Sequence, residues 1–483
     1  MFVRPAARAV GALLVCVAGG CLSPLDGFAG TSRPPKPSVS PRVTAGDDAG
    51  RRTALPRDAA ADGAGAPSLD DTASPDAYIR YALHFSPSVN AAYQRWRAAA
   101  ERLPQVGSLP DPRLNVGFFL DEVETRTGAQ RARVGVSQTL PWPGVLEGRA
   151  DAAAREARAA WRAYEAERLA VTETVVEILH ELAYLDSAAR IARENLELLG
   201  SFEEVVRARY RVGSGSHPEL VRVQVELGEL EDRLDRLRAM RPAYAAELNA
   251  ALNRPPDADV PALGALPGRV VAVGGVELAA LARASNPLLR GLEERAAAER
   301  RLGEVARLEG LPDLTVGVDY IVTGEAVDGT IAESGDDPIL LGFGVRLPLW
   351  REKYEAGVRE AIARRLAVSR RRAGEANRIS AAIQRAWFEH TDADRRVRLY
   401  ETTLIPKSEE SLRASLAGFR AGETGFLDLL DTERTLLEFA LAAARARADR
   451  GQALARLNRL VGRRVPTDAA DQHADDNSEE GTP

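Results

Sequence analysis

The chain has 483 residues, of which 45% are hydrophobic, and its 64 Lys and Arg against 70 Asp and Glu leave a formal net charge of −6. One compact core is excluded, because domains usually hold roughly 100–200 residues. The acidic balance argues against a nucleic-acid-binding protein, since phosphate recognition usually leaves a strongly basic face. Composition alone is therefore typical of a soluble, helix-rich protein.

Residues 1–21 have the pattern of a secretory signal peptide. Basic residues precede an apolar run that ends in Gly-Gly-Cys at Cys21. Small residues before a cysteine resemble the cleavage site of bacterial lipoproteins, so Cys21 is a candidate for lipid attachment, with ordinary signal cleavage as the alternative. The other cysteine, Cys16, also lies in this segment. The remaining chain therefore has no thiol for a disulfide, a zinc site or a nucleophile.

The segments that flank the structured part are compositionally biased. Residues 22–75 are rich in Pro, Gly, Ala, Ser and Asp without an apolar period, which predicts a flexible tether. Residues 467–483 form an acidic tail that we also expect to be disordered.

An internal duplication divides the region between them into residues 76–270 and 271–466. Residues of the first half recur in the second at an offset of 200 that drifts to 207 and then 209. The matched pairs include Pro87 and Pro287, Gly135 and Gly342, Gly213 and Gly422, and Asn249 and Asn458. Because prolines and glycines match in the same order, we expect one structural unit to occur twice.

Each half begins with a predicted helix, at 76–106 and 276–308, and continues with two strands. Alternating apolar residues in the strands fit either a half-buried sheet or a membrane β-barrel strand. The predicted polar loops at 121–130 and 324–337 join each strand pair.

Each second strand runs through Leu-Pro into a tryptophan, Trp142 or Trp350. A tryptophan at a strand end suits the membrane interface, where we expect both residues to act as anchors. The alternative is that each indole packs in a layer between helices.

The strands are followed by unusually long predicted helices, 145–211 and 352–420. At 1.5 Å per residue, each would extend roughly 100 Å. A glycine-containing turn, at 212–216 or 421–425, leads into a shorter helix. Leucines spaced by three and four residues in the first of these shorter helices are typical of a coiled coil. The sequence therefore predicts two antiparallel coiled-coil hairpins.

Four strands cannot close a barrel, and an open sheet in lipid would leave backbone groups unsatisfied. Three chains would supply twelve strands, an even number in the known range.

This layout resembles the TolC-type outer-membrane efflux channel family, the outer-membrane component of tripartite efflux pumps. The motifs that carry the resemblance are Leu109-Pro110-Asp111-Pro112, Leu140-Pro141-Trp142, Tyr210-Arg211-Val212-Gly213, Phe419-Arg420-Ala421-Gly422 and Asp428-Leu429-Leu430-Asp431. The resemblance implies a mainly α fold with a small β part: a trimeric α-helical barrel of coiled-coil hairpins topped by a 12-stranded transmembrane β-barrel. It implies a location in the outer membrane of a Gram-negative-type envelope, extending into the periplasm. The implied partners are two further copies, outer-membrane lipid, a periplasmic adaptor and an inner-membrane pump.

In similar channels a pair of aspartates beyond the second hairpin turn forms the periplasmic gate, and the matching residues are Asp428 and Asp431. They are spaced i,i+3 and so share a helix face. The alternative is a solvated face on which Asp431 pairs with Arg434. The resemblance also implies a gate tether from a tyrosine and an arginine, but the matching positions hold Phe419 and Thr424.

Nothing in the sequence favours an enzyme. The five histidines are widely separated, and no metal-binding spacing, phosphate-binding loop or nucleophile elbow is present, so we expect neither a metal site nor a cofactor. The expected function is a passive channel for efflux or type I secretion. The alternatives are a periplasmic coiled-coil adaptor and a structural helical protein without a pore.

Overall fold

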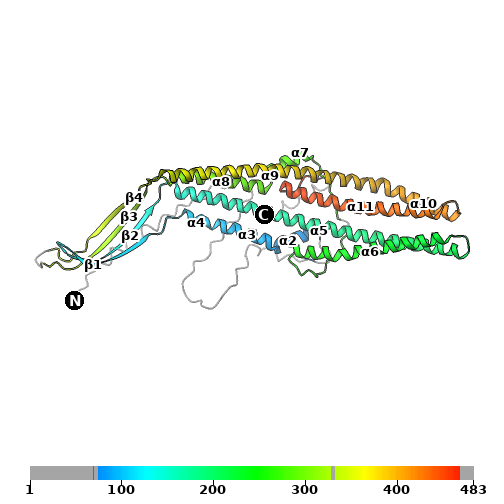
Figure 1. The fold of residues 1–483 in the computed structure, drawn as a ribbon, viewed down its shortest axis with the longest axis horizontal. Helices are drawn as coiled ribbons and strands as arrows, with labels where there is room; N and C mark the ends of the chain where they lie inside the picture. The colour runs from blue at the N-terminus through cyan, green and yellow to red at the C-terminus, as the bar shows by residue number, and fades with distance from the viewer. Residues whose placement is uncertain (1–68, 70–73, 265, 328–331, 468–483) are drawn as a thin grey trace, which may run out of the picture. The chain divides into compact units, whose positions relative to one another are not determined.

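The computed structural model describes residues 69, 74–264, 266–327 and 332–467. Cys21 and the predicted signal peptide lie outside the described residues, as do nearly all of the predicted tether and tail. The described part is mainly helical and contains one four-stranded sheet (Figure 1).

The predicted first helix of each half is broken. In the first half it forms α2 (Pro75–Phe85), α3 (Pro87–Ala100) and α4 (Arg102–Gly107), and in the second half α7 (Gly275–Ser285) and α8 (Pro287–Leu308). The prediction of single helices at 76–106 and 276–308 was therefore wrong. Ser86 and Asn286 precede prolines, which disfavour the helical conformation, and both take extended backbone angles while capping the next helix.

The coiled-coil hairpins form as predicted in outline. The first consists of α5 (Val145–Arg211) and α6 (His217–Ala251). In the second, the predicted helix 352–420 is interrupted: α9 (Arg351–Leu399) passes through a π-helical turn, η1 (Tyr400–Leu404), into α10 (Ile405–Ala421). Pro406 lies in the first turn of α10 and cannot donate a backbone hydrogen bond to the preceding turn, which is a physical reason for the wider turn there. The hairpin closes with α11 (Phe426–Val461).

The sheet joins the two halves of the chain. It consists of β1 (Arg113–Thr125), β2 (Gly128–Leu140), β3 (Asp313–Thr323) and β4 (Ile339–Arg346), all antiparallel in the order β1-β2-β3-β4. The predicted polar loop 121–130 is mostly strand, which corrects the prediction. The turn between β1 and β2 is short because Gly128, with a φ of 131°, adopts a backbone conformation that favours glycine.

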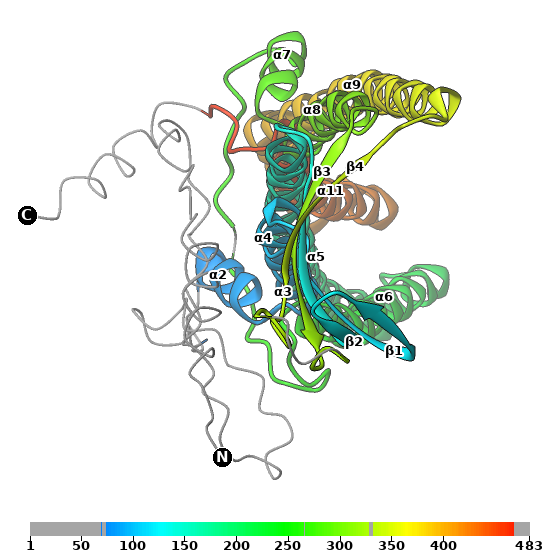
Figure 2. The same ribbon diagram turned by 90° about the vertical axis from the view of Figure 1, so that its left-hand side faces the viewer.

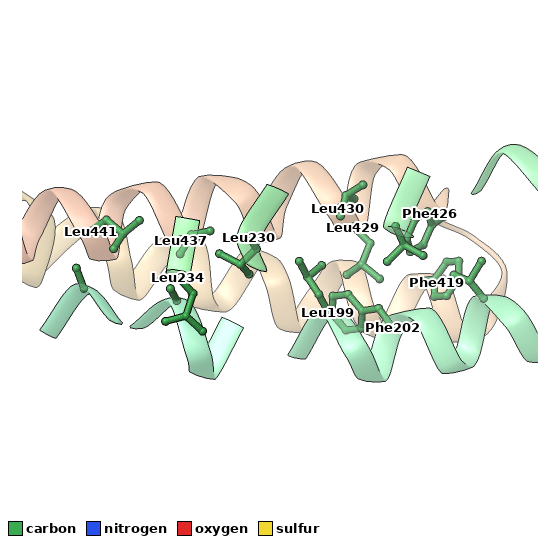
Figure 3. Packing of buried hydrophobic residues seen from close by; sticks show 14 residues of the cluster. Leu199, Phe202, Leu230, Leu234, Phe419, Phe426, Leu429, Leu430, Leu437 and Leu441 are labelled. Carbon is green, nitrogen blue, oxygen red and sulfur yellow. The ribbon is translucent and has the colours of Figure 1, made fainter. Parts of the chain in front are cut away.

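The largest hydrophobic cluster lies between the two hairpins. Its buried residues come from α5, α6, α10 and α11, and they include Leu199, Phe202, Leu230, Phe419 and Phe426 (Figure 3). Viewed end-on, α2 and α3 pack on one side of α5, and α7 packs on α9 (Figure 2). Apolar contacts therefore hold the hairpins together from both halves of the sequence.

Among the helices of the described residues, none is both long and apolar enough to cross a membrane.

Candidate functional site

One face of the sheet is apolar across all four strands. The cross-strand register places Leu114 opposite Val136, Val136 opposite Val318 and Val318 opposite Leu341, and directly paired residues point to the same face. The large exposed apolar residues of this face include Leu114, Val116, Phe118, Val134, Val136, Leu140, Leu314, Ile339, Leu341, Phe343 and Val345. An apolar surface this broad on a water-soluble protein would mark an interaction site, so the face requires an apolar environment.

The opposite face is mainly polar or glycine. Arg133 of β2 contacts Asp319 of β3 at 2.6 Å, and Arg346 contacts Asp313 at 2.7 Å. A side chain at Gly135 would collide with the Asp319 carboxylate, so glycine leaves the space that this ion pair needs. The alternation of apolar and polar residues predicted for the strands is therefore present in the sheet.

The two predicted anchor tryptophans lie where the strands meet the long helices. Trp142 is 39% exposed and donates its backbone N–H to Asp313 at 3.2 Å, whereas Trp350 is 79% exposed at the start of α9. Neither indole belongs to the buried core among the described residues. Both indoles are accessible in the single chain, and their role as membrane-interface anchors stays a prediction.

The two hairpin turns lie at the ends of α5 and α10 that are farthest from the sheet (Figure 1). Gly213 and Gly422 adopt φ angles of 73° and 80°, which end the helices in a left-handed conformation. The guanidinium of Arg209 lies over the Phe419 ring, 4.6 Å from its centroid, and the Phe419 and Phe426 rings are 5.8 Å apart. The position implied for the tether tyrosine therefore holds a buried phenylalanine under an arginine from the other hairpin.

Asp428 and Asp431 lie in the first turns of α11 and are exposed. Arg434, the partner considered for Asp431, instead contacts Glu226 of α6 at 3.4 Å. In the described part of the chain, the two aspartates are therefore exposed side chains on one helix face, and the Asp431–Arg434 ion pair does not form.

A buried glutamate near these aspartates was missed by the sequence analysis. Glu433 is only 1% exposed, and it lines a cavity between α6 and α11 together with Glu226, which is 8% exposed. Burial, with a smaller contribution from the Glu226 charge, raises the pKa of Glu433 to about 7, against the lowering effect of Arg434. The sequence offered one unused signal: at the offset of 209, Glu433 corresponds to Gln224.

Comparison with known proteins identifies the family. The family model for outer membrane efflux proteins matches residues 78–254 and 278–463, which is most of the chain. The chain belongs to the outer membrane efflux protein family. The family resemblance expected from the sequence is therefore confirmed, and the family's members are channels rather than enzymes.

Relatives and solved structures agree with this assignment. The cobalt-zinc-cadmium resistance protein CzcC of Cupriavidus metallidurans is 22% identical over 392 residues, which cover 78% of this chain and 87% of that protein. The outer membrane protein VceC of Vibrio cholerae superposes with a TM-score of 0.65 at 18% identity, covering 80% of this chain and 96% of VceC. The open-state MtrE channel of Neisseria gonorrhoeae superposes with a TM-score of 0.66 at 20% identity, covering 80% of this chain and 89% of MtrE. These likenesses establish the fold of an outer-membrane channel.

Proposed function

We propose that three copies of this chain form a passive channel across the outer membrane and the periplasm. The observation that carries the proposal is the sheet with one broad apolar face and one mainly polar face. In lipid, the apolar face would contact hydrocarbon and the polar face would line a water-filled lumen. Membership of the outer membrane efflux protein family supports this orientation.

The edges of the sheet argue for closure by other copies. In the order β1-β2-β3-β4, the outer edges of β1 and β4 lack a neighbouring strand among the described residues. Unpaired backbone groups in lipid cost several kcal/mol each, so β4 of one copy would pair with β1 of the next. Three copies would close a barrel of twelve strands, and the paired hairpins would form an α-helical barrel beneath it.

The remaining assignments follow from the family. The two repeats, 76–270 and 271–466, would each supply two strands and one hairpin. A periplasmic adaptor and an inner-membrane pump would bind the complex and provide the energy. Trp142 and Trp350 would sit at the membrane interface, with Cys21 acylated and residues 22–75 serving as a tether. Mass spectrometry of the mature N-terminus tests the lipid, because an unmodified residue other than Cys21 contradicts acylation.

Asp428 and Asp431 would form the periplasmic gate. Threefold symmetry would bring six carboxylates into two rings at a narrow throat, where they would attract cations and set ion selectivity. The structure supports this role because both side chains are exposed on one face beside a hairpin turn.

Divalent metal cations are the first cargo to test. The relative CzcC is named for cobalt, zinc and cadmium resistance. A zinc efflux assay in cells that also produce a periplasmic adaptor and an inner-membrane metal pump would separate this cargo from drug or protein export.

The experiment that tests the channel is single-channel recording in planar bilayers. Wild type should sediment as three chains in detergent and conduct with a preference for cations. Replacing both gate residues, Asp428→Ala with Asp431→Ala, should raise conductance and reduce cation preference. The matched control replaces Glu352 and Glu355, exposed acids of equal spacing at the other end of the helical part, and should leave both properties unchanged.

Two results would contradict the proposal. Extraction without detergent as a non-conducting species would favour the adaptor or structural alternative. Unaltered conductance and selectivity in the double aspartate variant would show that the gate lies elsewhere.

A further inference from the structure

A cavity that is open to solvent lies between helices from both halves of the sequence. Its volume is about 670 Å³, and its lining comes from α5, α6 and α11. Leu199, Leu230 and Leu437 supply apolar walls and lie near one another between the hairpins (Figure 3). This volume is within the range of small-molecule sites. The leucines and Val225 share the lining with eight charged residues.

The polar group that distinguishes this cavity is Glu433. Neither of its carboxylate oxygens has a hydrogen-bond partner among the described residues. A buried carboxylate without a partner is costly, so such a group either takes up a proton or binds a cation. The cavity therefore holds an unused acceptor with two oxygens.

Two of the three arginines that line the cavity are paired with acids that also line it. Arg434 contacts Glu226, and Arg236 contacts Asp232 at 2.6 Å. Arg233 also lines the cavity, but so do the acids Glu229 and Glu438, which leaves five acidic against three basic residues in the lining. The lining therefore favours a positive occupant over a negative one.

In the first hairpin, the residue that corresponds to Glu433 has a hydrogen-bond partner. Gln224, which corresponds to Glu433 at the offset of 209, donates its side-chain amide to Glu203 of α5 at 3.1 Å. At the same offset the counterpart of Glu203 is Leu412, which offers no polar atom. The second hairpin thus replaces a donor by a carboxylate and the acceptor by an apolar residue, which leaves Glu433 to a partner from outside the chain.

We propose that this cavity binds a small organic cation, a primary ammonium or guanidinium-like group on an apolar body, with Glu433 as its carboxylate partner. The cationic N–H groups would donate to both Glu433 oxygens, and the apolar body would contact the leucines. Because burial raises the pKa of Glu433 to about 7, the carboxyl of the empty site is mostly protonated below that pH, and binding of the cation there releases the proton to the solvent. The site is a property of the folded hairpins and exists whether or not the trimer conducts.

Titration calorimetry of the full-length protein in non-ionic detergent tests the site, with benzamidinium as the cation and benzamide as its neutral isostere. At pH 6.5 we expect saturable binding of one benzamidinium per chain. Repeating the titration in buffers of different ionisation enthalpy should show release of roughly three-quarters of a proton per cation, since the pKa of Glu433 is raised to about 7 and the carboxyl is mostly protonated at pH 6.5. Benzamide should not bind.

The decisive variant is Glu433→Gln, which keeps the size of the side chain and removes its charge. We expect its affinity for benzamidinium to fall roughly tenfold or more and proton release to disappear, because a charge-assisted pair is lost. Glu409→Gln, an exposed residue of α10 outside the cavity, should bind as wild type does.

Each other outcome overturns the proposal. Equal affinity in wild type and the Glu433→Gln variant would place the cation elsewhere. Absence of saturable binding to wild type, or equal binding of benzamide, would show that the cavity is not a cation site. A melting curve for each variant confirms that the helices remain folded.

Discussion

The Arg209 guanidinium lies over the Phe419 ring, 4.6 Å from its centroid, and donates to the Phe419 carbonyl oxygen at 3.4 Å. The two residues come from α5 and α10, and so this contact joins the two hairpins near their turns. Phe419 is 5% exposed, so the cation contacts a ring shielded from water, where cation–π attraction is strongest.

Replacing the ring should loosen the hairpin tips. Phe419→Leu keeps an apolar side chain but removes the cation–π contact, worth about 0.5–2 kcal/mol. Amide hydrogen exchange around residues 205–217 and 415–428 should become several-fold faster. Tyr354→Leu removes the contact with Lys353 at the far end of the helices and should leave tip exchange unchanged. Unchanged tip exchange in Phe419→Leu would show that the contact does not hold the hairpins together.

Two ion pairs of similar length should differ in their effect on stability because of burial. The Asp394 side chain is 4% exposed and contacts Arg450 and Arg398, both at 2.8 Å. Asp394→Ala leaves Arg450, itself 14% exposed, without this partner. The substitution should lower the free energy of unfolding by about 3–5 kcal/mol. Asp232→Ala removes the exposed ion pair with Arg236 and should lower the free energy of unfolding by less than about 1 kcal/mol. Chemical denaturation followed by circular dichroism measures both, and equal losses would contradict the argument.

A glycine in α11 is required by close packing. A Cβ atom at Gly451 would overlap the ring of His180 on α5. Gly451→Ala should therefore destabilise the protein by about 1–3 kcal/mol, despite the better helix propensity of alanine. At Gly374 of α9 nothing lies within 4 Å of the added atom, so Gly374→Ala should stabilise by up to about 1 kcal/mol. Melting temperatures that shift in the same direction would refute the steric explanation.

Stability should fall with rising pH because of Glu433. Burial raises its pKa from 4.5 to about 7, so between these values the folded state holds a proton that the unfolded state lacks. Its contribution is complete below pH 4.5 and is lost as pH rises through 7. Glu433→Gln stays uncharged, so its melting temperature relative to wild type should increase from pH 5 to 7 and then level off. A difference in melting temperature between the variant and wild type that does not change with pH would contradict the raised pKa of Glu433.

His180 should produce the opposite dependence. Burial, assisted by the nearby Arg450 charge, lowers its pKa from 6.5 to about 4. Between these values the unfolded state binds the proton and the folded state does not, so this contribution is complete above pH 6.5 and lost as pH falls toward 4. In the His180→Gln variant, the melting temperature should depend less on pH between pH 4 and 6.5 than it does in wild type. An unchanged slope there would show that His180 is not buried in its neutral form.

Local sequence predicted the elements of the fold better than their ends. The heptad leucines and the alternating strand residues set the period of each element, and the hairpins and sheet follow that period. The breaks at Pro87, Pro287 and Pro406 were not predicted, although proline chemistry could have indicated them. The loop predicted at 121–130 is mostly strand, because cross-strand pairing overrides the polar composition of that segment.

Some residues of the candidate sites could be predicted from the sequence, and others could not. Asp428 and Asp431 could be selected from the sequence because one helix face holds both. Glu433 could not, since its burial arises where α5, α6 and α11 meet, and helix periodicity alone does not report that contact. The pairing of Arg434 with Glu226 rather than Asp431 likewise depends on the neighbouring hairpin.

The sequence by itself determined the family, the repeated unit's order of elements and the apolar and polar faces of the strands, because these depend on spacing along the chain. Only the tertiary structure decided which charges pair, which acid is buried and which ring lies under Arg209. Those properties depend on residues that are about 200 positions apart in sequence and meet only when the two hairpins pack together.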